Sequence, residues 1–81
     1  MTEITQELVN KALSEDYREH FLSEYWQLKI RLQKLDRMLE NWEDLDFTPQ
    51  TPKSILLDQA DIMRRYLHIL GVRAKIEKIG L

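Results

Sequence analysis

The 81-residue sequence predicts an all-α fold, in which an antiparallel two-helix hairpin with a short N-terminal helix assembles into a helical-bundle oligomer. Two long stretches repeat hydrophobic residues at alternating spacings of three and four, the pattern of amphipathic helices that pack on one another. Both prolines lie between these stretches, and the chain has only two glycines, so a turn-rich β fold is not expected. Because the chain is short, we expect a single domain over residues 1–81.

The first long helix is predicted over residues 17–45. No Gly or Pro interrupts this stretch, and most of its polar residues are Glu, Gln, Lys and Arg, which favour helix. Its hydrophobic residues repeat at spacings of four and three, which places them on one face of a helix. They are Phe21, Tyr25, Leu28, Leu32, Leu35, Leu39 and Trp42.

A turn is predicted over residues 46–51, because Pro49 and Pro52 each disfavour helix at the preceding residue. Thr51 is a suitable N-cap, and Pro52 suits the first position of the next helix. That second helix is predicted over residues 52–78. It continues through Gly71, and its hydrophobic face carries Leu56, Ala60, Met63, Leu67, Leu70 and Ala74.

Residues 3–13 form a shorter amphipathic stretch. Ser14 is a candidate N-cap for the following helix, so we interpret residues 3–13 as a separate short helix. The alternative is one continuous helix, because Val9, Leu13 and Tyr17 extend a ridge with a spacing of four into the first long helix.

Both long helices carry more hydrophobic surface than one hairpin can bury. On the second helix, isoleucines repeat every seven residues beside the main hydrophobic face, and the first helix has a ridge with a spacing of four. Monomers rarely expose such stripes, so we predict a homo-oligomer. Its interface residues would be Leu22, Trp26, Ile55, Ile62, Ile69 and Ile76. The alternative is a monomeric three-helix bundle in which residues 3–13 cover part of this surface.

The sequence contains no pattern typical of an enzyme, a cofactor site or a metal site. There is no cysteine, no glycine-rich phosphate loop and no His-Glu-x-x-His motif, and His20, Glu24 and His68 are too few for a metal site. No apolar run is long enough to span a membrane, and no signal peptide opens the chain. We therefore expect a cytoplasmic protein that is not an enzyme and needs no cofactor.

Four residues beside the main hydrophobic faces suggest a small ligand. Trp26 and Tyr66 offer aromatic planes for stacking. Arg65 and Arg73 lie near Tyr66 in sequence and suit phosphate groups, so these residues would bind a nucleotide at a junction between subunits. The alternative is that they only form the interface. Direct binding to duplex DNA is not expected, because the formal net charge is −2.

Residues 17–79 resemble a family of short bacteriophage proteins that fold as helical hairpins. The residues that carry the resemblance include Phe21-x-x-Glu24-Tyr25-x-x-Leu28, Met63-x-x-Tyr66-Leu67-x-Ile69-Leu70 and Arg73-Ala74-x-Ile76-Glu77. This family is similar to the hairpin domain of phage anti-CBASS and anti-Thoeris proteins, oligomeric sponges that sequester cyclic nucleotide messengers of bacterial immunity. Their Arg-x-Phe-x-Tyr-His stretch has no counterpart here, so no binding residue is transferred by position.

Three functions are therefore considered. The resemblance implies a phage anti-defence protein that sequesters a cyclic or adenosine-derived nucleotide in the cytoplasm of an infected bacterium. The second is an anti-CRISPR-like inhibitor that binds a host immune effector through the acidic residues Glu40, Glu43, Asp44 and Asp46. The third is a phage scaffold or adaptor that acts only through helix association.

Overall fold

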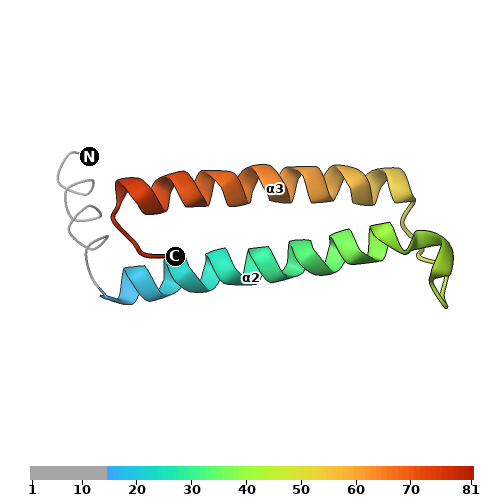
Figure 1. Cartoon of the computed structure of the whole chain (residues 1–81), viewed down its shortest axis with the longest axis horizontal. Coiled ribbons are helices and arrows are strands. Elements are labelled where there is room, and N and C mark those ends of the chain that lie inside the picture. The colour runs from blue at the N-terminus through green and yellow to red at the C-terminus, as the bar shows by residue number, and fades with distance from the viewer. Residues whose placement is uncertain (1–14) are drawn as a thin grey trace.

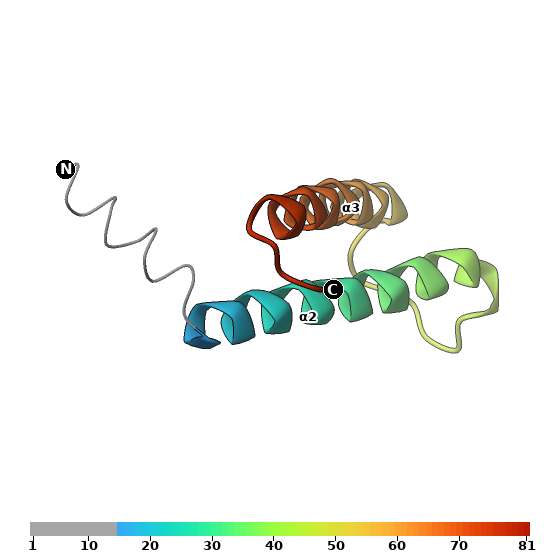
Figure 2. The same ribbon diagram turned by 60° about the vertical axis from the view of Figure 1, so that its left-hand side comes forward.

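The structure is a computed structural model, and it describes residues 15–81. Two long helices, α2 (Glu15–Glu40) and α3 (Lys53–Ile76), lie side by side and run antiparallel (Figures 1 and 2). A short 3-10 helix, η1 (Trp42–Asp44), begins the connection between them. Within residues 15–81 there is no strand, so the predicted all-α hairpin is confirmed. The short helix predicted over residues 3–13 lies outside the described residues.

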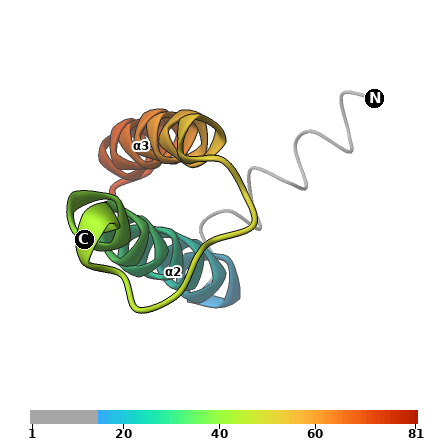
Figure 3. The same cartoon turned by 90° about the vertical axis from the view of Figure 1, so that its right-hand side faces the viewer.

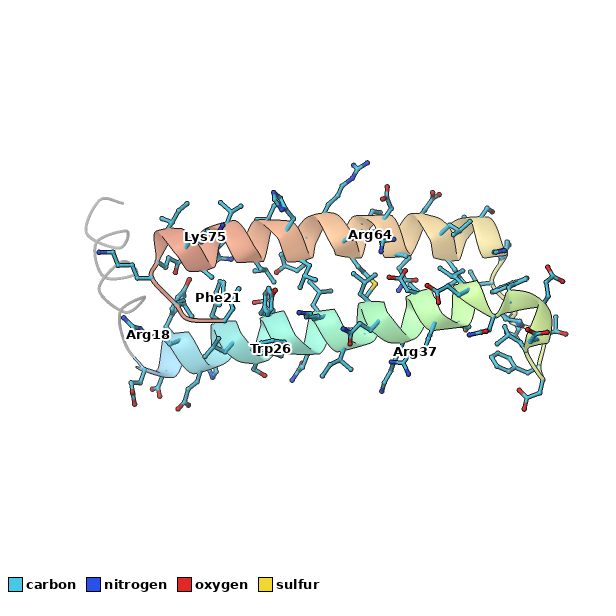
Figure 4. All side chains as sticks on the ribbon, viewed as in Figure 1. Arg18, Phe21, Trp26, Arg37, Arg64 and Lys75 are labelled. Atoms are coloured by element: carbon cyan, nitrogen blue, oxygen red, sulfur yellow. The ribbon has the colours of Figure 1, made fainter. Side chains whose placement is uncertain are left out.

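Viewed from the loop end, α2 and α3 form one layer of two helices (Figure 3). The side chains between them form two hydrophobic clusters. The Phe21 cluster contains Phe21, Leu70, Ala74 and Ile79, and Phe21 lies between the two helices (Figure 4). The Leu32 cluster, nearer the loop, contains Leu32, Leu39 and Ala60. All but Ile79 belong to the two hydrophobic faces predicted from the sequence, so the helices meet through the expected residues.

Helix α2 ends at Glu40, before the predicted end at residue 45. The backbone N–H of Asn41 donates to the carbonyl of Arg37 over 3.1 Å, and its side-chain amide donates to the same carbonyl over 2.9 Å. The chain then tightens into η1, which presents Glu43 and Asp44. Negative charge is unfavourable at a helix C-terminus, and this charge favours the early end of α2.

Helix α3 begins at Lys53 and runs through Gly71 without interruption, as predicted. Pro52 is its N-cap, so the start of the helix lies one residue later than expected from a Thr51 cap. The carbonyl of Pro52 accepts hydrogen bonds from the N–H groups of Ile55 and Leu56, at 3.1 and 3.3 Å. The cap thus satisfies these two N–H groups through the backbone alone.

The C-terminal end of α3 is closed by a Schellman motif. Lys78 has a φ of 57°, in the left-handed region, and its N–H donates to the carbonyl of Lys75 over 3.4 Å. The N–H of Ile79 donates to the carbonyl of Ala74 over 2.8 Å. The chain then crosses toward α2 (Figure 1), and Ile79 is buried in the Phe21 cluster. The helix ends at Ile76, shortly before the predicted residue 78.

The second set of hydrophobic residues predicted from the sequence is mostly exposed. The four isoleucines of α3 expose between 53% and 73% of their surface, and Trp26 exposes 42%. Leu22 is half-buried against the Phe21 cluster. The expected surplus of hydrophobic surface is therefore present on the hairpin. Neither described helix is long and apolar enough to cross a membrane.

Candidate ligand-binding groove

An open groove of about 580 Å³ lies along the C-terminal half of α3, where this helix faces α2. We call it the basic groove. The lining residues that matter most are Tyr25, Arg64, His68, Gly71, Lys75 and Leu81. Tyr25 comes from α2, Leu81 comes from the tail that crosses toward α2, and the other four come from α3.

The four lining residues of α3 lie on one stripe of that helix. Arg64, His68, Gly71 and Lys75 are spaced four, three and four residues apart, so successive members stand about one turn above each other. Arg64 and Lys75 are eleven residues apart, which corresponds to roughly 16 Å along a helix. The two cations therefore mark the two ends of the groove.

Gly71 keeps the middle of the groove open. A Cβ atom built at this position would have no neighbour within 4 Å, so no packing contact requires a glycine here. Glycine inside a helix costs about 1 kcal/mol relative to alanine. The helix accepts this cost at the position where a larger side chain would fill the groove.

The described lining of the basic groove is positively charged. Its described side chains include the guanidinium of Arg64 and the ammonium of Lys75, and no Asp or Glu side chain. Arg64 donates to Asp36 over 2.9 Å, with 54% of its side chain exposed, so its other N–H groups remain accessible. Lys75 makes no ion pair with any residue in 15–81. An anion in the groove could therefore pair with Lys75, which has no ion-pair partner in residues 15–81, and with Arg64, which also pairs with Asp36.

Tyr25 lines the groove on the α2 side and packs against the neighbouring Trp26. The rings of Tyr25 and Trp26 meet edge to face, with centroids 5.3 Å apart and planes at 87°. The ammonium of Lys29 lies 5.0 Å from the centroid of the Trp26 ring. The groove thus combines cations with an aromatic ring, which suits a ligand that carries both phosphate groups and a base.

Two of the site residues predicted from the sequence make contacts within the hairpin. The Tyr66 hydroxyl donates to the carboxylate of Glu24, and this hydrogen bond, with some burial, raises the pKa of Tyr66. Arg73 donates to the hydroxyl of Tyr17 over 2.7 Å and to Glu77 over 3.3 Å. Its guanidinium also lies 5.1 Å from the centroid of the Phe21 ring. Arg73 therefore ties the two helices together beside the Phe21 cluster.

The other two predicted residues lie apart from these. Arg65 pairs with Asp61 over 3.4 Å on the outer surface of α3, with 78% of its side chain exposed. Trp26 follows Glu24 by two residues, or about 200° around the helix, so it points away from the side where Glu24 meets Tyr66. One hairpin therefore does not bring Trp26 and Tyr66 together. Tyr66 and Arg73 share a face of α3, being seven residues apart.

The sequence interpretation missed Tyr25, Arg64, His68 and Lys75 as lining residues. Their signal was the spacing of four, three and four between Arg64, His68, Gly71 and Lys75. Within the described part of the chain, no group of three potential metal ligands is close enough to hold a metal ion.

A family model described as Sequestin matches residues 15–76, which include all of α2, the connection and α3. The matched range contains every lining residue of the basic groove except those of the C-terminal tail. No curated protein and no solved structure matches the chain significantly.

Proposed function

We propose a sequestering function from the premise that this chain belongs to the Sequestin family, whose name indicates that a bound molecule is held. The family supports the resemblance to sponge-like helical hairpins. We further propose that this is a phage anti-defence protein and that the molecule is a cyclic or adenosine-derived nucleotide messenger of bacterial immunity. It would act by binding alone, in the cytoplasm of the infected host, without converting its ligand.

The observation that supports this proposal is the basic groove. Arg64 and Lys75 are available for charge-assisted hydrogen bonds to phosphate, and Tyr25 offers a ring between them for a base. A charge-assisted hydrogen bond contributes about 1.5–3 kcal/mol, and stacking of a base on an aromatic ring about 1–3 kcal/mol. Two charge-assisted bonds and one stacking contact sum to about 4–9 kcal/mol, which corresponds to dissociation constants from about 1 mM to just below 1 μM.

Isothermal titration calorimetry with a panel of cyclic di- and trinucleotides and ADP-ribose tests the proposal. We expect saturable binding to at least one member, and the affinity should fall as salt rises, because the charges are screened over about 10 Å at 0.1 M. Lys75→Ala and Arg64→Ala should each weaken binding by roughly 10- to 150-fold. Lys34→Ala and Arg37→Ala remove the same charges from exposed positions of α2 outside the groove and should leave the affinity unchanged.

Gly71→Met separates binding from stability. Methionine favours helix, so the variant should unfold at a higher denaturant concentration than the unaltered chain. The same side chain would project into the groove and should abolish nucleotide binding. A variant that is more stable and still binds the nucleotide with full affinity would place the ligand elsewhere.

A second proposed position for the ligand is a junction between subunits of a homo-oligomer, formed by Trp26, Tyr66, Arg65 and Arg73. Arg65 is the cleanest test of this position, because its only described partner is the exposed Asp61. If Arg65→Ala weakens nucleotide binding and Lys75→Ala does not, the junction is the site. If no nucleotide in the panel binds, the proposal moves to a protein target, as an inhibitor of an immune effector, and then to a scaffold.

A further inference from the structure

A row of four isoleucines runs along the outer surface of α3. We call Ile55, Ile62, Ile69 and Ile76 the isoleucine row; they expose 53%, 64%, 53% and 73% of their surface. On the face of the same helix that packs against α2, Ala60, Leu70 and Ala74 expose 1% or less. The row presents on the order of 400 Å² of apolar surface, comparable with the largest patches that monomers expose.

We propose that a second copy of this chain docks on the isoleucine row, with the two α3 helices antiparallel. Hydrophobic residues at intervals of seven form a straight stripe that matches the same stripe on another helix. A stripe of this kind is self-complementary, as a two-fold symmetric dimer requires. The dimer would use α3 and leave the basic groove, on a different face, open to solvent.

Charges beside the row favour the antiparallel arrangement. Asp58 and Arg65 flank the row on the same side, one before and one after Ile62. In an antiparallel pair centred on Ile62, the flank of one helix that carries Asp58 and Arg65 faces the same flank of the other helix. Asp58 then lies opposite Arg65 of the partner subunit, and the two-fold symmetry forms this ion pair twice. In a parallel pair, the flank with Asp58 and Arg65 faces the other flank of the partner helix, which carries Gln59 and Tyr66. The ion pairs between Asp58 and Arg65 of the two subunits then do not form. Opposed helix dipoles also favour the antiparallel pair.

The guanidinium of Arg65 remains accessible to Asp58 of the partner subunit. Arg65 and Asp61 expose 78% and 60% of their side chains, and their own contact of 3.4 Å is long and lies at the surface. A guanidinium has five N–H donors, so Arg65 can keep this contact and also bind Asp58 of the partner subunit.

The area is sufficient for a modest dimer. The two isoleucine rows with Tyr66 and the stems of Arg65 on each copy would bury roughly 1,200 Å² in total, the lower end of stable protein interfaces. We therefore expect a dimer that forms at micromolar concentration and dissociates on dilution.

Single cysteines test both the partner and the direction, because the unaltered chain contains no cysteine. Under mild oxidation, Ile62→Cys should form a disulfide-linked dimer, since position 62 meets itself at the symmetry axis. Ile55→Cys and Ile69→Cys should each stay uncrosslinked alone and crosslink when mixed. Efficient crosslinking of all three separately would show a parallel pair and overturn the antiparallel arrangement.

Light scattering without ligand tests the dimer itself. The unaltered chain should show about twice its 9.8 kDa mass at high micromolar concentration, and Ile62→Glu with Ile69→Glu should return it to the monomer with helix content unchanged. Leu57→Glu is the matched control, because Leu57 is a 49%-exposed hydrophobic residue of α3 outside the row, and it should stay dimeric. A monomeric unaltered chain would overturn the proposal and indicate that residues 1–14 or another protein cover the row.

The same variants keep this inference separate from the proposed function. The four isoleucines do not line the basic groove, so the monomeric variant should still bind the nucleotide there. Loss of the dimer with binding intact would leave the sequestering function standing. Absence of nucleotide binding in a dimeric chain would leave the interface standing.

Discussion

The Phe21 cluster at one end of the hairpin buries side chains from α2, α3 and the C-terminal tail, whereas the Leu32 cluster near the loop buries side chains from α2 and α3 alone. Ile79 folds back onto the Phe21 cluster, and Tyr17 and Arg73 join α2 to α3 beside it. At the other end, Trp42 and Leu56 are half-buried. Contacts that fix the relative position of the helices are therefore concentrated at the end that contains the basic groove.

The helix termini show the same difference. At the groove end, α3 closes in a Schellman motif, and Arg73 and Lys75 in its last turn suit the helix dipole. At the loop end, α3 starts without a side-chain cap, and acidic residues crowd the end of α2. We infer that the groove is built on the end where more contacts join the two helices, because a ligand site benefits from fixed geometry.

Leucine truncations at the two ends test this comparison and should give the largest effect. Leu70 is fully buried in the Phe21 cluster, so Leu70→Ala should lower the free energy of unfolding by about 3–5 kcal/mol. Leu32→Ala should cost about 2–3 kcal/mol, because the more open Leu32 cluster can relax around the cavity. Urea unfolding measures both. A larger loss for Leu32→Ala would reverse the comparison.

Tyr17→Phe removes the hydroxyl that accepts a hydrogen bond from Arg73. The hydroxyl also hydrogen-bonds Glu77, so we expect the free energy of unfolding to fall by about 1–3 kcal/mol, because one hydrogen bond usually contributes about 0.5–1.5 kcal/mol. Tyr25→Phe is the control, because Tyr25 has no hydroxyl hydrogen bond to a residue in 15–81, and it should change stability little. Equal losses in the two variants would show that the Tyr17 contact does not stabilise this end.

The pH dependence of the same variant provides a second measurement. A hydrogen bond to Glu77, followed by burial, raises the pKa of Tyr17 above its ordinary value of 10.0, although Arg73 lowers it. The folded state therefore prefers protonated Tyr17. This contribution is fully present below pH 10 and is lost as the pH rises through the folded-state pKa. Above pH 10, the stability of the unaltered chain should fall more steeply than that of Tyr17→Phe.

Lys78→Gly should have the smallest effect and the opposite sign. Lys78 adopts a left-handed conformation that costs a residue with a Cβ about 1–2 kcal/mol, and glycine avoids this cost. Part of the gain is offset by the greater freedom of glycine in the unfolded chain. We expect a net stabilisation of about 0.5–1 kcal/mol by thermal unfolding. A destabilised variant would mean that the lysine side chain contributes more than its backbone costs.

The fold followed from the sequence because it depends on periodicity. The spacing from Phe21 to Leu39 and from Leu56 to Ala74 is enough to define two helices and the faces on which they meet. The early end of α2 was missed, because it depends on the unfavourable position of Glu43 and Asp44 near the helix C-terminus. Hydrophobic periodicity does not show this electrostatic effect.

The candidate site was harder to predict, because it depends on how the helices are placed along and around each other. Arg73 suits a phosphate by residue type, yet its guanidinium binds Tyr17, which lies 56 residues earlier in the chain. That contact exists only at one axial position of α3 against α2. In the sequence, an ordinary solvated helix face is indicated by Arg64, His68 and Lys75. The groove exists only because Tyr25 of α2 and the C-terminal tail lie beside this face.

The return of Ile79 to Phe21 also has a consequence for the order of folding. This contact joins residues 58 positions apart, whereas the loop end brings Trp42 and Leu56 together across a short connection. Closing the longer loop costs more chain entropy, so the loop end should form first and carry the higher φ-values. Truncations in the Phe21 cluster should then mainly accelerate unfolding. The groove would then be the last part of the hairpin to assemble.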